Sequence, residues 1–524
     1  MSISRRLFQI CLWGALAITL PATVRAQFTF STNNGSLTIT GYTGSGGVVN
    51  IPETTNTLPV VNIGRAAFSN KVTITSIIIP NTTTNLGTNA FYLCTGLTNI
   101  SWGTNVQFIG PGAFFGCSRL PTVTVPDTVR SLGTNVFNRC GSLTNAVIGS
   151  AVPQLDNDAF ANCTDLSSLV IGNSVTNIST RAFSFCTNLP TITIPASVTA
   201  IGSMVFYGCY SLTNIGVDGL NAAFTSLDGV LFNKAQTVLR AYPQKTGSYV
   251  VPPGVTVIGD YAFAFCKGLP QLVCGDDVTT IGDGACFYCD GLTNVVFNNG
   301  LQTIGISAFE GCGLENIVFP DSVTALNYYT FGFCGALTNV NFGSGLSAIF
   351  YYSFLYCSNL ASITIPDGVT AIQDSAFENC YRLSNVVIAK TVTNLGGDAF
   401  TYCTNANFYF RGDAPSHGLG PFSMDTGTIY YLPGATGWGA NYDGLRTVFW
   451  LAAAQTGDGS FGVLTNQFGF NITGPSGQTF VVEATTNLND WQPLATNTLG
   501  GSAVYFSDSQ WGNYPRRCYR LRFP

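Results

Sequence analysis

The residues with the clearest chemical spacing are two cysteines three positions apart. Cys286-Phe287-Tyr288-Cys289 has the C-x-x-C spacing of redox-active thiols and of paired zinc ligands. A structural zinc site needs further Cys or His ligands, and the chain has one histidine, His417. Both cysteines also fall on columns of a sequence repeat, Cys289 in a cysteine column and Cys286 in a phenylalanine column. We therefore expect core residues here, and no metal or cofactor.

No set of residues predicts catalysis. His417 lies in Pro415–Gly418, outside the repeat, and no G-x-S-x-G elbow accompanies it, so we expect a surface loop residue. Arg411-Gly412-Asp413 spells an integrin-type tripeptide, which arises easily by chance. The sequence therefore predicts a protein that is not an enzyme; a secreted hydrolase using the insertion or the tail described below is the least favoured alternative.

The acidic and glycine residues also follow the repeat. Asp127, Asp321 and Asp367 each follow a proline at one repeat position, which indicates turn chemistry and not a pair of opposed carboxylates. Glycines such as Gly202 and Gly282 recur at one coil position, where we expect turns to need them. No phosphate-binding glycine loop is evident.

The repeat has the pattern A-F-x-x-C-x-x-L-x-x-I-x-I-P-x-x-V-x-x-I-G. Its cysteine column contains Cys94, Cys117, Cys140, Cys163, Cys186, Cys209, Cys266, Cys289, Cys312, Cys334, Cys357, Cys380 and Cys403. Neighbouring members lie 23 positions apart, with one spacing of 22 and one of 57, and a phenylalanine precedes nearly all of them by three positions. A fixed period of this length is typical of a solenoid.

Each repeat predicts one short strand and one turn. Ile192-Thr193-Ile194 alternates apolar and polar residues, as a half-buried strand does, and Pro195 ends it. The A-F-x-x-C segment is too short for a stable helix and predicts a helical or 3₁₀ turn. One unit cannot enclose its own apolar residues, so successive units must stack with their strands parallel.

The cysteine column leaves two interpretations open. A secreted chain with 17 cysteines suggests disulfides. Thirteen of them share one coil position, however, where free Cys fills a corner beside Phe as a small buried hydrophobe. Neighbouring coils place these residues within bridging distance, although side chains that point the same way make good disulfide geometry harder.

These residues resemble the leucine-rich repeats of the BspA-like bacterial class, over nearly the whole stretch from about Ile63 to Cys403. The resemblance implies a leucine-rich-repeat solenoid, mainly β, with a parallel β-sheet on one face. It also implies a general binding or surface scaffold. The fold alone does not define which function the scaffold serves. The tail resembles small β-sandwich modules of secreted bacterial proteins, so we expect such a domain after the solenoid.

The predicted domains follow from where the repeat starts, breaks and ends. They are a signal peptide at 1–26, an N-terminal cap at 27–62, the solenoid at 63–410 with a β-hairpin insertion at 216–250, a C-terminal cap and linker at 411–450, and the β-sandwich module at 451–524. The hairpin is expected to turn at Asn233-Lys234. Trp491 is expected in the core of the module.

Composition and the amino terminus predict the compartment. Arg5-Arg6, the apolar run Leu7–Leu20 and Val24-Arg25-Ala26 have the form of a secretory signal peptide, so we expect a secreted or cell-surface protein. Charged residues make up 9% of the chain and the net charge is −5. The absence of a basic stripe argues against nucleic acid, and no later segment reaches the length of a membrane span.

One exposed column is a candidate binding surface. Uncharged polar residues recur two positions after each repeat Leu, and the amides among them are Asn99, Asn145, Asn214, Gln271, Asn294, Asn316, Asn339 and Asn385. One interpretation is a solvent-tolerant ladder whose side chains bond to each other. The other is a polar groove for a peptide or glycan, although few aromatic residues accompany the column for stacking on sugars.

The sequence thus predicts a non-catalytic scaffold that binds an unidentified extracellular protein or glycan. The alternative is a structural protein of the cell envelope or matrix, attached through residues 451–524. Both hypotheses fit a large regular scaffold without a catalytic set.

Overall fold

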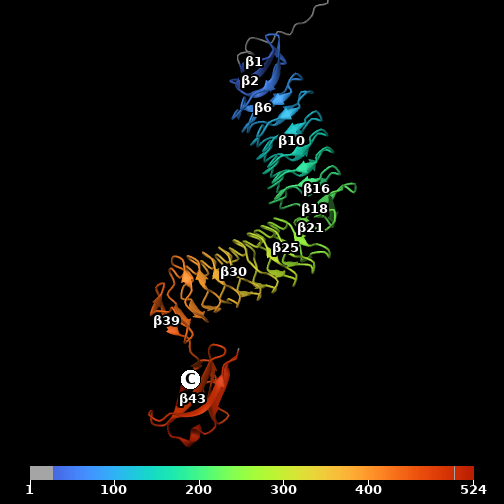
Figure 1. The fold of residues 1–524 in the computed structure, drawn as a ribbon. Coiled ribbons are helices and arrows are strands. Elements are labelled where there is room, and N and C mark those ends of the chain that lie inside the picture. The colour runs from blue at the N-terminus through green and yellow to red at the C-terminus, as the bar shows by residue number, and fades with distance from the viewer. Residues whose placement is uncertain (1–26, 501) are drawn as a thin grey trace, which may run out of the picture. The chain divides into compact units, whose positions relative to one another are not determined.

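A computed structural model describes residues 27–500 and 502–524. The predicted signal peptide and Cys11 lie outside the described residues. The chain divides into two compact units, Met1–Lys234 and Ala235–Pro524, and each is described by itself (Figure 1).

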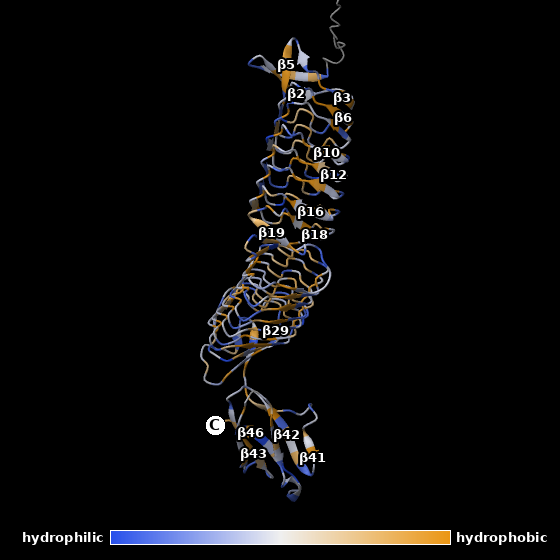
Figure 2. Ribbon diagram, turned by 90° about the vertical axis from the view of Figure 1, so that its right-hand side faces the viewer, coloured by the Kyte–Doolittle hydropathy of each residue, from blue (hydrophilic) through white to orange (hydrophobic). Residues whose placement is uncertain are grey.

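Stacked coils build the first unit, and each contributes one strand to a parallel ladder. These strands are β3 (Gly47–Asn50), β6 (Ile74–Ile78), β8 (Asn99–Ser101), β10 (Thr122–Thr124), β12 (Asn145–Val147), β14 (Ser168–Val170), β16 (Thr191–Ile194) and β18 (Asn214–Val217). Thr122 pairs with Asn145 and Asn145 with Ser168, one repeat apart and in parallel. The predicted parallel stacking is confirmed, and hydrophobic stretches recur from coil to coil through β10 and β12 (Figure 2).

A second parallel ladder, which the sequence analysis did not predict, runs along the same coils. Its strands are β5 (Leu58–Ile63), β7 (Asn85–Leu86), β9 (Phe108–Ile109), β11 (Ser131–Leu132), β13 (Gln154–Leu155), β15 (Asn177–Ile178) and β17 (Ala200–Ile201). Gly202 follows β17 without a positive φ, so the turn explanation for it is wrong. A Cβ there would lie 2.6 Å from the backbone nitrogen of Thr180, so close approach of the neighbouring coil excludes a side chain.

The Phe column forms the core of the first unit. Adjacent rings stack with centroid distances of 5.1 Å for Phe91 and Phe114 and 5.2 Å for Phe137 and Phe160, and all four side chains are fully buried. Phe28 and Tyr42 cover Phe68, the first ring of the stack. These two residues belong to the antiparallel pair β1 (Phe28–Asn33) and β2 (Ser36–Tyr42), while β4 (Thr54–Thr55) pairs with β5.

The A-F-x-x-C turns differ from the predicted helical or 3₁₀ turn. Asn89 and Leu93 have φ angles of 57° and 54°, in the left-handed region, so no helix can propagate. Their N–H groups donate to carbonyl oxygens of the next coil at 2.9 and 2.7 Å, whereas the N–H of Cys94 donates back to Phe91 at 3.2 Å. Alternate residues thus bond within one coil and between coils.

The first unit also contains a hairpin between residues 216 and 234. Strands β19 (Phe224–Leu227) and β20 (Val230–Asn233) pair antiparallel around Asp228-Gly229, whose φ angles of 49° and 74° suit a two-residue hairpin turn. This turn was not predicted, and a second turn, at Lys234 and Ala235 directly after β20, overlaps the predicted Asn233-Lys234. Buried Asn221 holds the hairpin, because its side chain donates to the carbonyl oxygens of Pro195 and Val198 at 2.7 and 2.9 Å.

The second unit repeats the two-ladder plan. Its longer ladder strands are β22 (Tyr249–Val250), β24 (Gln271–Val273), β26 (Asn294–Val296), β28 (Asn316–Val318), β29 (Asn339–Asn341), β31 (Ser362–Thr364), β33 (Asn385–Ile388), β35 (Asn407–Phe410), β37 (Thr428–Tyr431) and β39 (Leu445–Phe449). The predicted C-terminal cap thus contributes two more parallel strands, β37 and β39, which pair as Ile429 with Thr447. The domain boundaries themselves stay predictions.

The other ladder of the second unit has shorter strands. They are β21 (Val238–Ala241), β23 (Val257–Ile258), β25 (Thr280–Ile281), β27 (Thr303–Ile304), β30 (Ala348–Ile349), β32 (Ala371–Ile372), β34 (Asn394–Leu395) and β36 (Ser416–His417), and β38 (Asn441–Tyr442) pairs antiparallel with β39. Phe331, Phe354, Phe377 and Phe400 stack between the ladders at 5.2 to 5.6 Å.

Residues 451–524 form the predicted β-sandwich. One antiparallel sheet contains β40 (Ala453–Ala454), β41 (Gly462–Leu464), β42 (Gln467–Thr473) and β45 (Val504–Asp508); the other contains β43 (Thr479–Thr485), β44 (Gln492–Thr498) and β46 (Cys518–Arg522), with a 3₁₀ turn at Trp511–Asn513. Phe470, Phe480 and Phe506 from both sheets share one core. Trp491 is not part of it: Arg520 covers its ring at 4.2 Å.

Candidate binding surfaces

The predicted amide column is a row of register-matched side chains in the second unit. Asn294 pairs with Gln271 on one side and with Asn316 on the other, and Asn316 pairs with Asn339. Asn385 stands at the start of β33 in the same repeat position. All are exposed except Gln271, which is half-buried.

In the first unit the column is less uniform. Asn99 and Asn214 are exposed and Asn145 is half-buried. Asn99 donates to Ser76 Oγ at 3.1 Å, as the ladder interpretation predicts for this position. Asn214 lies beside the hairpin, since a Cβ on Gly229 would stand 2.5 Å from its side-chain oxygen.

A hydroxyl column one position earlier makes side-chain bonds between coils. Thr144 donates to the carbonyl oxygen of Pro121 at 3.0 Å, and Thr293 and Thr338 make the same bond in the second unit at 3.2 and 3.0 Å. These hydroxyls, and not the amides of Asn294 or Asn316, carry the bonds that tie one coil edge to the next.

A hollow of about 470 Å³ lies over β26 and β28. It is lined by Asn294, Val296, Phe297, Asn316, Val318, Phe319 and Asp321, among others. Val296 and Val318 are 42% and 59% exposed. The repeat pattern identifies the two amides but not the valines, because apolar residues within a repeat strand are normally assigned to the core.

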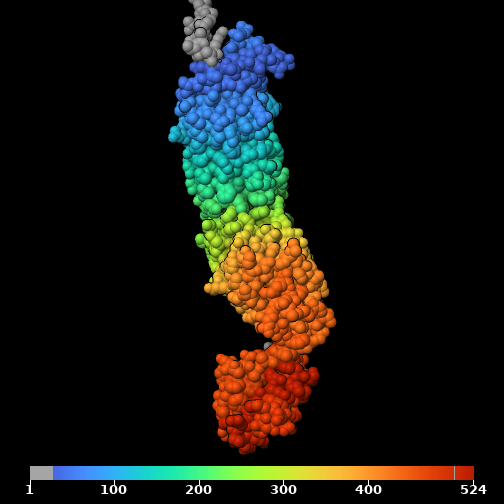
Figure 3. Space-filling model, turned by 90° about the vertical axis from the view of Figure 1, so that its left-hand side faces the viewer, coloured from blue at the N-terminus to red at the C-terminus, as the bar shows by residue number. Residues whose placement is uncertain are grey.

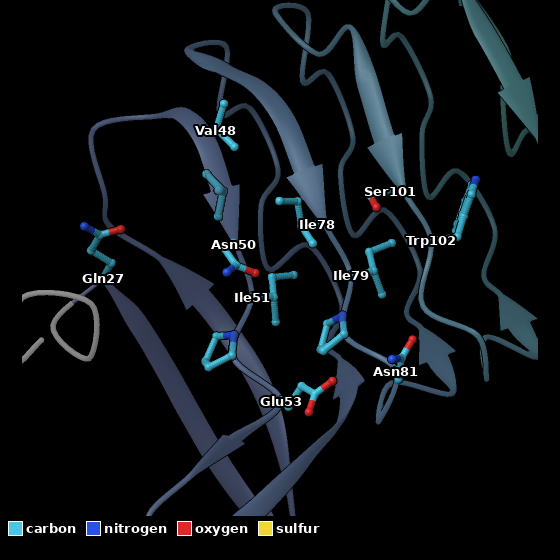
Figure 4. Close-up of a pocket in the computed structure, with 13 residues that line it drawn as sticks. Gln27, Val48, Asn50, Ile51, Glu53, Ile78, Ile79, Asn81, Ser101 and Trp102 are labelled. Atoms are coloured by element: carbon cyan, nitrogen blue, oxygen red, sulfur yellow. The ribbon is translucent and has the colours of Figure 1, made fainter. Parts of the chain in front are cut away.

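A second hollow, of about 640 Å³, lies over the first strands of unit one (Figure 4). Asn50, Ile78 and Ser101 occupy one register row on β3, β6 and β8, and Trp102 stands at the end of β8. Glu53 and Asn81 form its polar end. No signal in the repeat identified this hollow, since it involves residues before the regular pattern begins.

The cysteine column has a structural task. Each thiol in the column donates to a backbone carbonyl of the preceding coil, for example Cys163 to Phe137 at 3.2 Å and Cys357 to Phe331 at 3.3 Å. Burial raises the pKa of several of these thiols, for example to about 12 at Cys140 and Cys209. Sixteen described cysteines are free, and all but Cys518 are buried.

The C-x-x-C pair has no access to a substrate. Cys286 and Cys289 are fully buried and Cys312 is 2% exposed. Burial raises the pKa of Cys286 and Cys312. At Cys289 burial acts in the same direction, but hydrogen bonds from the other two thiols outweigh it and lower the pKa. The arrangement is a buried thiol cluster, as the core interpretation predicts.

The remaining candidate groups are held by structural bonds. Asp127 and Asp321 each accept the backbone N–H of the next coil at 2.7 Å, which lowers the Asp127 and Asp321 pKa values. These bonds join neighbouring coils and are not the local turn bonds that were predicted. His417 is exposed on the two-residue strand β36 and not in a loop. Asp413 accepts the N–H of Thr436 at 2.6 Å.

Within residues 27–500 and 502–524, no cluster of three or more His, Cys, Asp or Glu side chains is placed to hold a metal ion. The same residues contain no helix with the length and apolar character needed to cross a bilayer. Figure 3 shows one face of the first unit, where successive coils pack against each other along the chain.

Solved structures of bacterial leucine-rich repeat proteins have similar folds. A leucine-rich cell surface protein from Faecalibacterium prausnitzii is 29% identical, with a TM-score of 0.50 over 76% of this chain and 97% of that one. A leucine-rich repeat protein from Bacteroides ovatus is 25% identical, with a TM-score of 0.51 over 73% and 93%. Among curated proteins none matches.

The family pattern of the BspA type leucine-rich repeat region, which spans six copies, matches residues 48–167, 153–285 and 279–407. These ranges cover most of the chain and contain both the cysteine column and the amide column. The chain therefore belongs to the BspA-type leucine-rich repeat family.

Proposed function

We propose that this protein is an exported, non-catalytic scaffold that binds an extracellular protein through the exposed sheet face of its second unit. The observation that carries the proposal is the hollow over β26 and β28, where register-matched Asn294 and Asn316 alternate with exposed Val296 and Val318. Family membership supports a binding scaffold, and the F. prausnitzii neighbour is named as a cell surface protein.

An extended polypeptide fits this surface better than a glycan. Amide side chains repeat at the strand spacing of about 4.8 Å and offer both donors and acceptors, while the valines between them provide apolar contact. Phe319 is buried and Phe297 half-buried, so little ring face is open for stacking on a sugar. The hollow would therefore accommodate those side chains of a bound extended polypeptide that point toward the sheet.

The test uses the purified full chain against a displayed random-peptide library and a glycan array. Ligands retained by the natural protein are then measured against Asn294→Arg with Asn316→Arg, and against Gln302→Arg, an exposed residue beside β27 in the same coil. We expect at least tenfold weaker peptide binding for the double variant. The Gln302→Arg control should bind the peptide as the natural protein does. Unchanged peptide binding, or retention of glycans alone, would refute the assignment.

A structural role with attachment through residues 451–524 is the second candidate. The sandwich has its own hydrophobic core, as an independently folding attachment module would. Deleting this segment should then release the protein from the cell surface in fractionation, with the level of total protein as the control. Normal surface retention would reject this candidate.

A further inference from the structure

Aromatic side chains are exposed on the turns of the second unit, at the position before the column cysteine. Tyr288, Phe333, Tyr356 and Tyr402 are each 40 to 41% exposed. Their φ angles of 52°, 61°, 57° and 63° lie in the left-handed region. Bulky residues adopt this backbone at a cost.

The first unit provides an internal comparison for this position. Its turns place Leu93, Gly116, Arg139, Asn162, Phe185 and Gly208 there, in the same left-handed conformation, and Phe185, the aromatic residue among them, is half-buried. Glycine and asparagine are the residues that tolerate it best. Neither the backbone nor the core therefore requires aromatic residues at these turns, and the several exposed rings of the second unit need another explanation.

Two neighbouring coils carry the most compact part of this aromatic surface. The rings of Phe333 and Tyr356 stack at 5.3 Å with 12° between their planes, and those of Tyr329 and Tyr352 at 4.6 Å with 6°. Tyr381, 46% exposed, meets Tyr356 edge-on at 6.4 Å. These pairs present aromatic rings, with phenol groups, on a surface that the coils do not bury.

Carboxylates flank the ring pairs. Burial and the neighbouring Tyr352 raise the Tyr329 pKa, and the negative charges of Glu310 and Glu378 raise it further, so both carboxylates act on this phenol. Glu310 is itself half-buried, and burial raises its pKa. We call Glu310, Tyr329, Phe333, Tyr352, Tyr356 and Glu378 the aromatic–acidic face.

The surrounding coils carry charge of one sign. Residues 268–381 contain no Lys or Arg. Their acidic residues are Asp276, Asp277, Asp283, Asp290, Glu310, Glu315, Asp321, Asp367, Asp374 and Glu378. A partner that covers the aromatic–acidic face must therefore supply the positive charge itself.

We propose that the aromatic–acidic face binds a lysine- or arginine-rich polypeptide segment. A cation over a tyrosine ring is attracted by the ring's negative face, and carboxylates at the edge add charge complementarity. The hydrocarbon stems of Lys and Arg supply apolar contact to the same rings. This surface lies on the turns and is separate from the sheet face of the proposed function.

Calorimetric titration of the full chain with a ten-residue lysine peptide tests the proposal. A glycine–serine peptide of equal length and a neutral cello-oligosaccharide are the other titrants. We expect binding of the lysine peptide alone, with an affinity that falls as salt rises. Glu310→Gln with Glu378→Gln should weaken binding at least tenfold, and Tyr356→Leu, which removes the phenol ring, at least threefold.

Glu315→Gln is the matched control, because Glu315 belongs to the same acidic band but lies beside Asn316 on the sheet. It should leave the affinity within twofold, and circular dichroism should show that every variant is folded. Failure of the lysine peptide to bind overturns the proposal. An equal loss in Glu315→Gln, which would indicate unspecific attraction, also overturns it, as does tighter binding of the oligosaccharide.

Discussion

At the scale of single residues, each cysteine of the column fills a small space in the core and also donates a hydrogen bond to the preceding coil. The Phe carbonyl of each A-F-x-x-C turn faces the next coil, and the thiol of that coil donates to it, at 3.2 Å between Cys186 and Phe160. A thiol is small enough for the corner and apolar enough to be buried. This explains why so many cysteines occupy one column without requiring disulfides.

Replacing one of these thiols should therefore be costly. In Cys163→Ala, the Phe137 carbonyl loses the thiol donor and a small void remains, so the free energy of unfolding should fall by about 1–3 kcal/mol. Urea unfolding followed by circular dichroism measures the loss. Cys518→Ala, at the exposed cysteine, should change it by less than about 0.5 kcal/mol. Equal effects would contradict the assigned role.

The buried thiols also predict a sensitivity to alkali. Burial raises the pKa of Cys140, Cys209 and Cys334 from 9.0 to about 12, so the folded protein holds these protons at a pH where the unfolded chain releases them. The thiols' contribution to stability is complete below about pH 9 and is lost between about pH 9 and 12. Urea midpoints at pH 7, 9 and 10.5 should show a decline only above pH 9. A midpoint unchanged at pH 10.5 would contradict this.

At the scale of elements, the sequence predicts what the repeat makes periodic. The alternation in Ile192-Thr193-Ile194 identified the longer strands and the 23-residue spacing identified their partners. Two-residue strands such as Ala200–Ile201 are too short to alternate, so the second ladder gave no signal. The left-handed turns gave none either, because residues as different as Leu93 and Tyr356 occupy them.

The stacked rings are the element that joins the coils. Phe309 is fully buried and lies 5.3 Å from Phe331 with 2° between the rings. Phe309→Ala should lower the free energy of unfolding by about 3–5 kcal/mol through the cavity that it leaves. Hydrogen exchange should rise mainly in the two adjacent coils, since each coil contacts only its neighbours. An equal rise in residues 451–524 would contradict this picture.

At the scale of the whole molecule, the sequence predicted the scaffold better than the binding surfaces. The amide column was found by counting, but Val296 and Val318 were not, because a repeat strand gives no sign of which apolar residue is left uncovered. The rings of Phe333 and Tyr356 were missed because they neighbour the buried Phe column in sequence. Burial depends on what the next coil covers, which a single repeat cannot show.

The modular organisation makes one further prediction. Residues 451–524 enclose their own core around Phe470, Ile472 and Val482, so their packing does not depend on the Phe and Cys columns. A chain ending at residue 450 should keep the circular dichroism signal of the coils, and its thermal midpoint should lie within about 2 °C of the solenoid transition in the full chain. The reason is that the stability of a solenoid is the sum of the stabilities of its coils and of the contacts between neighbouring coils.

The isolated segment 451–524 should fold by itself, and Phe480→Ala within it should lower its midpoint without moving that of the chain ending at 450. Calorimetry of the two pieces and of the full chain measures these midpoints. If the truncated chain unfolds far below the corresponding transition of the full protein, the module stabilises the solenoid and is not a separate attachment domain. If both pieces reproduce their transitions, deletion of 451–524 becomes a clean test of attachment, because any change in location would not come from misfolding.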